Sequence, residues 1–145
     1  AIPAGAAAVV LTRESVAHDK GYKPVARSVA HAAHAQEPSE FTIAPVGAIN
    51  QLLEKTGWKA DDVDLWEINE AFACVTMFAM QDIGIPHDKI NVNGGGTALG
   101  HPIGASGTRI ITTLLGALEE RGLKRGIASL CIGGGEATAV AVELV

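Results

Sequence analysis

Residues 91–109 read NVNGGGTALGHPIGASGTR, and this stretch decides how the rest of the chain is expected to fold. It holds six glycines, which let the backbone adopt positive φ angles and let other groups approach closely. Proline at 102 restricts His101 to an extended conformation, so we predict that a stiff loop presents the imidazole. The alternative is a glycine-rich turn between a strand and a helix in which the histidine is incidental.

The loop leads directly into the clearest helix of the chain, which we predict over 106–120. Residues 104–107 form its opening turn, where free backbone N–H groups can receive negative charge. Its apolar residues recur on one side, and Gly122 is the expected C-terminal cap.

Strands and helices are expected to alternate along the rest of the sequence. The apolar patterns predict helices over 15–19, 45–56 and 69–82, and strands over 5–11, 25–35, 63–68, 90–92, 126–132 and 138–144. This order predicts an α/β domain with an antiparallel pair of strands at its end.

The overall composition excludes several classes of protein. Hydrophobic residues make up 48% and charged residues 19% of 145 residues, which predicts one globular domain with a substantial core. A net charge of −5 without a basic stripe argues against nucleic-acid binding. No apolar run is long enough to span a bilayer, and the first residues lack the pattern of a signal peptide.

The cysteines and histidines predict neither a disulfide framework nor a metal site. Two cysteines, Cys74 and Cys131, favour a reducing cytoplasm, and no group of residues has metal-ligand spacing. We interpret His31 and His34 as residues of a strand face, and Cys74 as a packing residue of a helix. The chain begins at Ala1 without methionine, which suggests a fragment or a processed protein.

Besides His101, two polar positions lie where a purely structural chain does not need them. Asn69 follows a predicted strand and is either a helix N-cap or a ligand for a water or a substrate oxygen. Cys131 ends an apolar strand and is either a core residue or part of a site. The second interpretation rests on the glycine turn after Ile132, whose backbone N–H groups can form an oxyanion hole.

Three ordered motifs resemble the C-terminal half of a thiolase. They are NEAFA at 69–73, NVNGGGTALGHPIGASG at 91–107 and CIGGGEAT at 131–138. The segment GAAAVV at 5–10 is similar to the strand that precedes the C-terminal domain in that family. The resemblance covers essentially the whole chain and favours the functional interpretations of Asn69 and His101.

For the fold, the resemblance implies a mixed β-sheet with helices packed on both faces, which is half of a layered α/β/α/β/α arrangement. Residues 1–13 are then the last strand of a preceding N-terminal domain, and residues 14–145 are the thiolase C-terminal domain. An apolar face is expected where the N-terminal half docks.

The resemblance also implies a role for each motif residue. His101 activates a nucleophilic cysteine and helps to bind the thioester oxygen. Asn69 holds the water that completes this first oxyanion hole. Cys131 removes a proton from the α-carbon of the second acyl-CoA and returns it in thiolysis, and the N–H of Gly133 contributes to the second oxyanion hole.

The implied activity is acyl transfer between acyl-CoA molecules, in the direction of condensation to acetoacetyl-CoA or of thiolysis. Coenzyme A thioesters are its substrates, and no tightly bound cofactor and no metal are expected. The implied partners are an N-terminal thiolase half and further copies of the protein, and the implied setting is cytoplasmic fatty acid metabolism.

The sequence departs from the thiolase pattern in one large respect. No stretch resembles the segment that carries the acylated cysteine, or the loop region that grips most of coenzyme A, and Ala4 stands where relatives usually have Asp. We therefore expect the chain alone to be inactive. The alternatives are a non-catalytic interaction module derived from a thiolase domain, and a relative of the ketoacyl synthases. Cys131 argues against the latter, which use His or Asn at this position.

Overall fold

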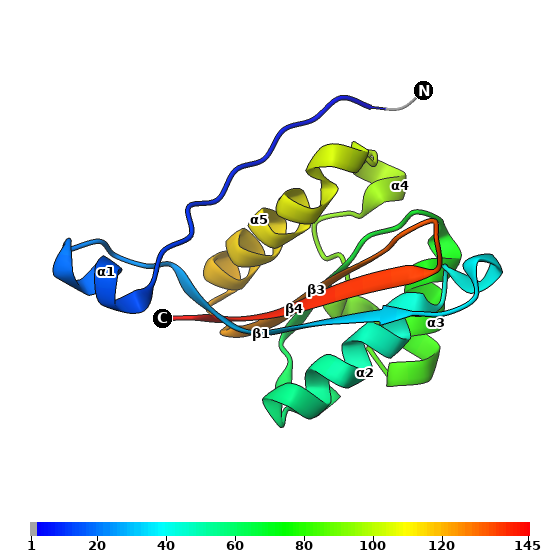
Figure 1. Ribbon diagram of the computed structural model, residues 1–145, viewed down its shortest axis with the longest axis horizontal. Helices are drawn as coiled ribbons and strands as arrows, with labels where there is room; N and C mark the ends of the chain where they lie inside the picture. Colours follow the sequence, from blue (N-terminus) through cyan, green and yellow to red (C-terminus); the bar gives the residue numbers. More distant parts are fainter. Residues whose placement is uncertain (1–2) are drawn as a thin grey trace.

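Four strands form one mixed sheet in the order β1-β4-β3-β2 (Figure 1). Strand β1 (Ala26–Ala35) pairs with β4 (Glu136–Leu144), and β4 pairs with β3 (Arg125–Cys131), both in antiparallel register. Strand β3 then pairs with β2 (Leu65–Ile68) in parallel. The computed structural model describes residues 3–145, and the antiparallel pair predicted for the end of the chain is confirmed.

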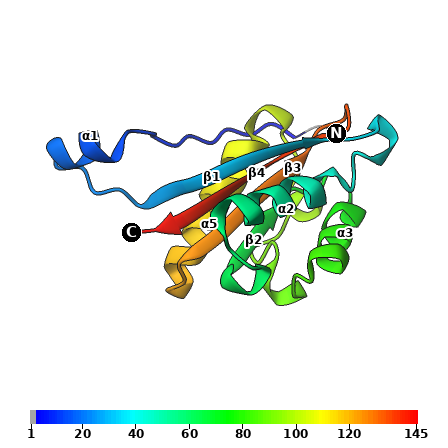
Figure 2. The same ribbon diagram turned by 60° about the horizontal axis from the view of Figure 1, so that its bottom comes forward.

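Helices cover both faces of this sheet, as predicted. Helices α2 (Ala44–Thr56) and α3 (Ala73–Ile83) pack on one face, and the long helix α5 (Ile103–Arg121) packs on the other (Figure 2). Two short helices, α1 (Glu14–Asp19) and α4 (Gly96–Leu99), lie in the connections. Single 3-10 turns occupy Pro38–Glu40, Ala60–Asp62 and His87–Lys89.

The alternating direction of side chains along each strand divides the core into two layers. On β3, Ile127 packs with the α2 and α3 residues, whereas Ala128 packs with α5. Helix α5 contributes Leu114, which is fully buried, and ends at Gly122 in the left-handed conformation predicted for its cap.

Two predicted elements are shorter in the structure. The helix expected from residue 69 begins only at Ala73, because Asn69 continues the pairing of β2 through its N–H, which donates to the Ser129 carbonyl at 2.9 Å. The strand expected at 90–92 is reduced to a single parallel bridge between Ile90 and Trp66.

The strand predicted at residues 5–11 is wrong for this chain. The segment is extended, but residues 3–12 make no backbone hydrogen bond within the described part of the protein. Val10 and Leu11 are 95% and 84% exposed, and Figure 1 shows the segment running outside the sheet, past α5. A strand needs a neighbour to satisfy its backbone groups, and no strand of the described chain is placed to provide one. Residues 1 and 2 of the predicted N-terminal strand lie outside the described residues.

None of the helices in residues 3–145 combines the length and the apolar character needed to cross a membrane.

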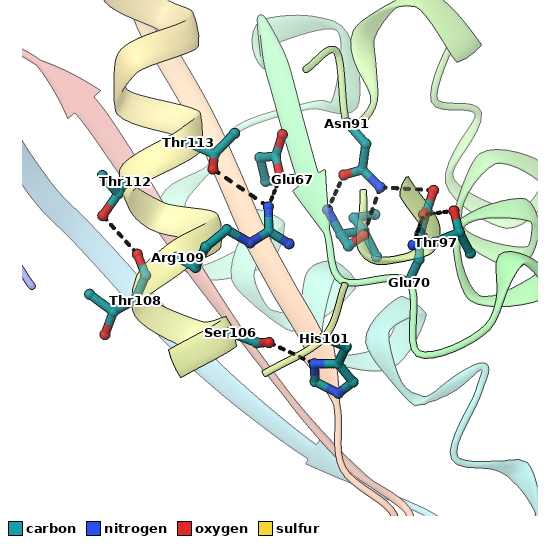
Figure 3. A network of polar contacts seen from close by, with 11 residues as sticks. Glu67, Glu70, Asn91, Thr97, His101, Ser106, Thr108, Arg109, Thr112 and Thr113 are labelled. Carbon is teal, nitrogen blue, oxygen red and sulfur yellow. Dashed lines mark hydrogen bonds and ion pairs between the residues drawn. The ribbon is translucent and has the colours of Figure 1, made fainter. Parts of the chain in front are cut away.

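A buried ion pair connects the sheet to α5. Glu67 on β2 is 1% exposed, and its Oε2 lies 3.4 Å from Nη1 of Arg109 on α5 (Figure 3). Burial raises the pKa of Glu67 to about 7, because Arg109 offsets the loss of water only in part and the nearby Glu70 adds repulsion.

This pKa predicts how the stability of the fold depends on pH. The folded chain binds the Glu67 proton more tightly than the unfolded chain, in which the carboxyl group has its ordinary value of 4.5. The contribution of Glu67 to the free energy of unfolding should therefore fall by up to about 3 kcal/mol as pH rises from about 4.5 to about 7.

Urea unfolding at several pH values will measure this contribution as the difference between the wild type and Glu67→Gln, which lacks the titrating group. Glu54→Gln removes an exposed carboxylate of α2 and should leave the pH profile unchanged. If the free energy of unfolding changes with pH in the same way in the wild type and in Glu67→Gln, the prediction is contradicted.

Candidate active site

The two parallel strands place the ends of two predicted motifs next to each other. Ile68 of β2 pairs with Ser129 of β3, and Asn69 and Cys131 follow at the same edge of the sheet. The carboxyl ends of parallel strands are where α/β proteins commonly bind ligands. This edge is therefore the candidate active site.

Asn69 and His101 are brought together although 31 residues separate them in the sequence. The Asn69 amide Nδ2 lies 3.5 Å from Nε2 of His101, and Asn69 is fully buried. Its Oδ1 has no hydrogen-bond partner within the described chain, so this atom is available to a water or a ligand. Interpreting Asn69 as a helix cap is wrong, because Phe72 occupies the N-cap position of α3.

Ser106 orients the imidazole and was not predicted as a site residue. Its Oγ lies 2.6 Å from His101 Nδ1 and donates its own hydrogen to the Pro102 carbonyl at 3.1 Å (Figure 3). With that hydrogen committed, Oγ accepts from Nδ1–H, and Nε2 carries the lone pair that faces Asn69. The signal in the sequence is the spacing: Ser106 lies in the first turn of the helix that follows His101.

Cys131 is buried at the end of β3, with 7% of its surface exposed. Burial raises the pKa of its thiol, and the thiol of Cys74 adds to this effect, so the neutral thiol is the resting form. Within residues 3–145 no hydrogen bond joins Cys131 to His101 or Asn69. The structure therefore places Cys131 at the same edge of the sheet as the His101–Asn69 pair, without a hydrogen bond to either residue among the described residues.

Gly133 lies in the exposed turn between β3 and β4. The turn is closed by a bond from the Gly135 N–H to the Ile132 carbonyl at 3.0 Å, and Gly135 has a φ of 98°. A side chain at Gly135 would collide with the Gln36 carbonyl, so only glycine fits there. Among the described residues the Gly133 N–H has no backbone acceptor and remains available to a ligand.

The remaining histidines predicted as strand residues do not form a metal site. His34 bonds to Gln36 and Gln51, and its ring lies where a side chain at Gly47 would be. In the described part of the chain, no group of three or more His, Cys, Asp or Glu residues is placed to hold a metal ion.

The hydrogen bond between Ser106 and His101 gives a prediction about the tautomer of the imidazole. In the neutral wild-type side chain the proton should reside on Nδ1, and Ser106→Ala should shift the population towards the Nε2–H form, because the acceptor for Nδ1–H is lost. Nitrogen-15 NMR of the neutral imidazole distinguishes the two tautomers.

Thr112→Ala is the matched control on the same helix, since among the described residues the Thr112 hydroxyl bonds to the Thr108 carbonyl alone, at 2.9 Å. A tautomer population that stays the same in Ser106→Ala would contradict the assignment.

Residues 22–144 match the family model described as "Thiolase, C-terminal domain". The acetyl-CoA acetyltransferase of Allochromatium vinosum is 50% identical over 139 residues, and the cytosolic acetyl-CoA acetyltransferase of Mus musculus is 49% identical over 139 residues. Each match covers 96% of this chain and 35% of the relative, so the chain spans about one third of the length of these proteins.

Solved structures give the same result. The crystal structure of the Bacillus anthracis acetyl-CoA acetyltransferase superposes with a TM-score of 0.89 at 44% identity, covering 91% of this chain and 34% of that one. The Acat5 thiolase of Ascaris suum, solved in complex with coenzyme A, gives a TM-score of 0.86 at 39% identity, covering 92% of this chain and 34% of that one. The matched domain, the sheet topology and the three motifs agree: the chain belongs to the thiolase family, of which it contains the C-terminal domain.

Proposed function

We propose that this chain is the C-terminal catalytic half of a thiolase and works together with an N-terminal half that carries the nucleophilic cysteine. The reaction is the condensation of two acetyl-CoA molecules to acetoacetyl-CoA and the reverse thiolysis. The observation that carries the proposal is the His101–Asn69 pair, held at 3.5 Å beside the end of the strand that bears Cys131.

The geometry supports a base role for His101. Its Nε2 carries a lone pair and can accept the proton of a thiol supplied by the N-terminal half. The resulting Nε2–H can then donate to the thioester oxygen, while Asn69 holds the water that completes this oxyanion hole. The unpartnered Oδ1 of Asn69 provides an acceptor for that water.

The environment of Cys131 supports the second proton transfer. In thiolysis the neutral thiol, favoured by burial, protonates the α-carbon as the bond between the two acyl units breaks. In condensation the thiolate form of the same group removes that proton, and the N–H of Gly133 contributes to the second oxyanion hole.

The outer face of α5 supports docking of the N-terminal half. Ile103 at the start of α5 is 71% exposed. Between Ile103 and Glu119 the helix has one charged residue, Arg109, whose side chain points inward and pairs with Glu67. Glycines at 104, 107 and 116 leave open space where a Cβ would stand. Glycine in an exposed helix costs about 1 kcal/mol relative to alanine, so its presence here favours close approach of another layer.

The extended segment at 3–13 supports the same arrangement, as the last strand of the N-terminal domain. Its apolar side chains and backbone groups are exposed, and a cavity of about 180 Å³ lies between its first residues and Pro102, Ala105 and Arg109. We further propose that the assembled protein is a cytoplasmic homo-oligomer of fatty acid metabolism. The name of the mouse relative includes "cytosolic", and Met77 on α3 is 61% exposed on a different side from α5.

The proposed function is tested by adding an N-terminal thiolase half to this chain. The part of the Bacillus anthracis enzyme that precedes the matched region is mixed with this chain, and thiolysis of acetoacetyl-CoA is followed by its absorbance. Activity should appear only in the mixture, and Asn69→Ala and Cys131→Ser should each lower kcat by about 100-fold to 10,000-fold.

Cys74→Ser is the matched control and should retain activity, since Cys74 lies within α3. A mixture that forms a complex without any thiolysis would instead favour the interaction module. Steady thiolysis by the isolated chain would show that it needs no second half.

Docking on α5 predicts opposite effects of one substitution on the chain and on the complex. Gly116→Arg should raise the stability of the isolated chain by about 0.5–1 kcal/mol, because arginine is a good helix former at this exposed position. The same variant should lose binding to the N-terminal half, because a charged side chain then occupies the interface. Calorimetric unfolding and titration measure the two effects, with Asn50→Arg on the outer side of α2 as the control. Equal binding by the wild type and Gly116→Arg would contradict docking at this face.

A further inference from the structure

The carboxylate of Glu70 is enclosed by the glycine stretch that precedes His101. Its Oε2 accepts the backbone N–H of Thr97 at 2.9 Å and also the Thr97 hydroxyl (Figure 3). A Cβ at Gly95 would collide with the Glu70 carboxyl group, and a Cβ at Gly96 would lie 2.8 Å from the Glu70 carbonyl oxygen. These two glycines therefore make room for a residue of their own chain.

Asn91 holds the backbone of Ile68, the residue directly before Asn69. Its Oδ1 accepts the Ile68 N–H and its Nδ2 donates to the Ile68 carbonyl, both at 2.8 Å, as a neighbouring strand would. Nδ2 also donates to Oε1 of Glu70 at 3.4 Å. In residues 3–145, Asn91 is the only non-glycine residue with positive φ, at 47°, a conformation that asparagine tolerates better than most residues.

We propose that Glu70 and Asn91 are positioning residues of the active site, which fix the backbone on both sides of Asn69 and so keep its amide within reach of His101. This inference rests on the proposed function. Neither residue contacts the reacting atoms. They act through Asn69, which lies between the two backbone positions that they hold.

The charge of Glu70 fits this role. Burial alone raises its pKa, but the hydrogen bonds from Thr97 and Asn91 outweigh burial and leave the pKa below its ordinary value. Glu70 is therefore an ionised acceptor at neutral pH, and hydrogen bonds to an ionised group are stronger than those between neutral groups.

The test uses two substitutions and their combination, in the chain supplied with its N-terminal half. Asn91→Asp keeps the acceptor for the Ile68 N–H and the tolerance for positive φ, but replaces Nδ2, the donor to both the Ile68 carbonyl and Glu70, by a carboxylate oxygen. Glu70→Gln removes the charge. In the double variant Gln at 70 can donate to Asp at 91 and still accept from Thr97, so the link between the two residues is restored with the opposite polarity.

Each single variant should lower kcat of thiolysis by about 10-fold to 100-fold while KM changes by less than about twofold, because a displaced catalytic amide impairs the transition state rather than substrate binding. The double variant should recover part of the loss, and Glu54→Gln on α2 should match the wild type. Single variants that lose stability but keep kcat when folded, or a double variant whose loss is the product of the single losses, would overturn the proposal.

NMR of the isolated chain separates this inference from the proposed function. The imidazole resonances of His101 and the side-chain amide of Asn69 should shift in Glu70→Gln and Asn91→Asp but not in Glu54→Gln. If the wild-type mixture shows no thiolysis, the proposed function fails while this comparison still decides whether the network positions Asn69. Unchanged resonances in both variants would overturn the positioning role.

Discussion

The parallel pairing of β2 with β3 is the constraint on which the site depends. It is only four residue pairs long, yet it brings Asn69 and Cys131 to one edge of the sheet. Parallel strands need a long crossover connection, and here the chain between β2 and β3 contains α3, the glycine stretch and α5. The same crossover therefore delivers His101 to the edge where the two strands end.

Some polar groups on β2, directly after it and on α5 are buried without a hydrogen-bond partner in residues 3–145. Within the described chain, four buried side-chain atoms have no hydrogen-bond partner: Trp66 Nε1, Glu67 Oε1, Asn69 Oδ1 and Arg109 Nη2. Such groups cost about 1–3 kcal/mol each and are rare in folded proteins. Of the residues that carry these atoms, Asn69 is the one whose side chain faces His101, so its unsatisfied oxygen belongs to the candidate site.

The sequence predicted the elements whose signals are local. Gly122 ends its helix as expected, and Gly57 ends α2 in the same left-handed conformation, since such a cap after an amphipathic run needs no tertiary information. The motifs also singled out Asn69, His101, Cys131 and Gly133. Ser106 has a local signal, its place in the first turn after His101, but the motifs did not single it out. The Glu70–Asn91 network could not be predicted in this way, because it depends on which side chains meet across the crossover.

The wrong prediction at residues 5–11 is informative for the same reason. AAAVVL at 6–11 resembles TAVAV at 138–142 in its alanine and valine content, and the latter lies in β4, which has a neighbour on each side. Small and β-branched residues suit such an interior strand, but composition states only what kind of neighbours a segment fits, not where they are. Among residues 3–145 no sheet accepts the segment, and no element of these residues covers the uncharged outer face of α5 beside it. The composition of residues 6–11 suits a strand with a neighbour on each side, and the outer face of α5 suits close packing. A single further layer, such as an N-terminal half would provide, explains both features.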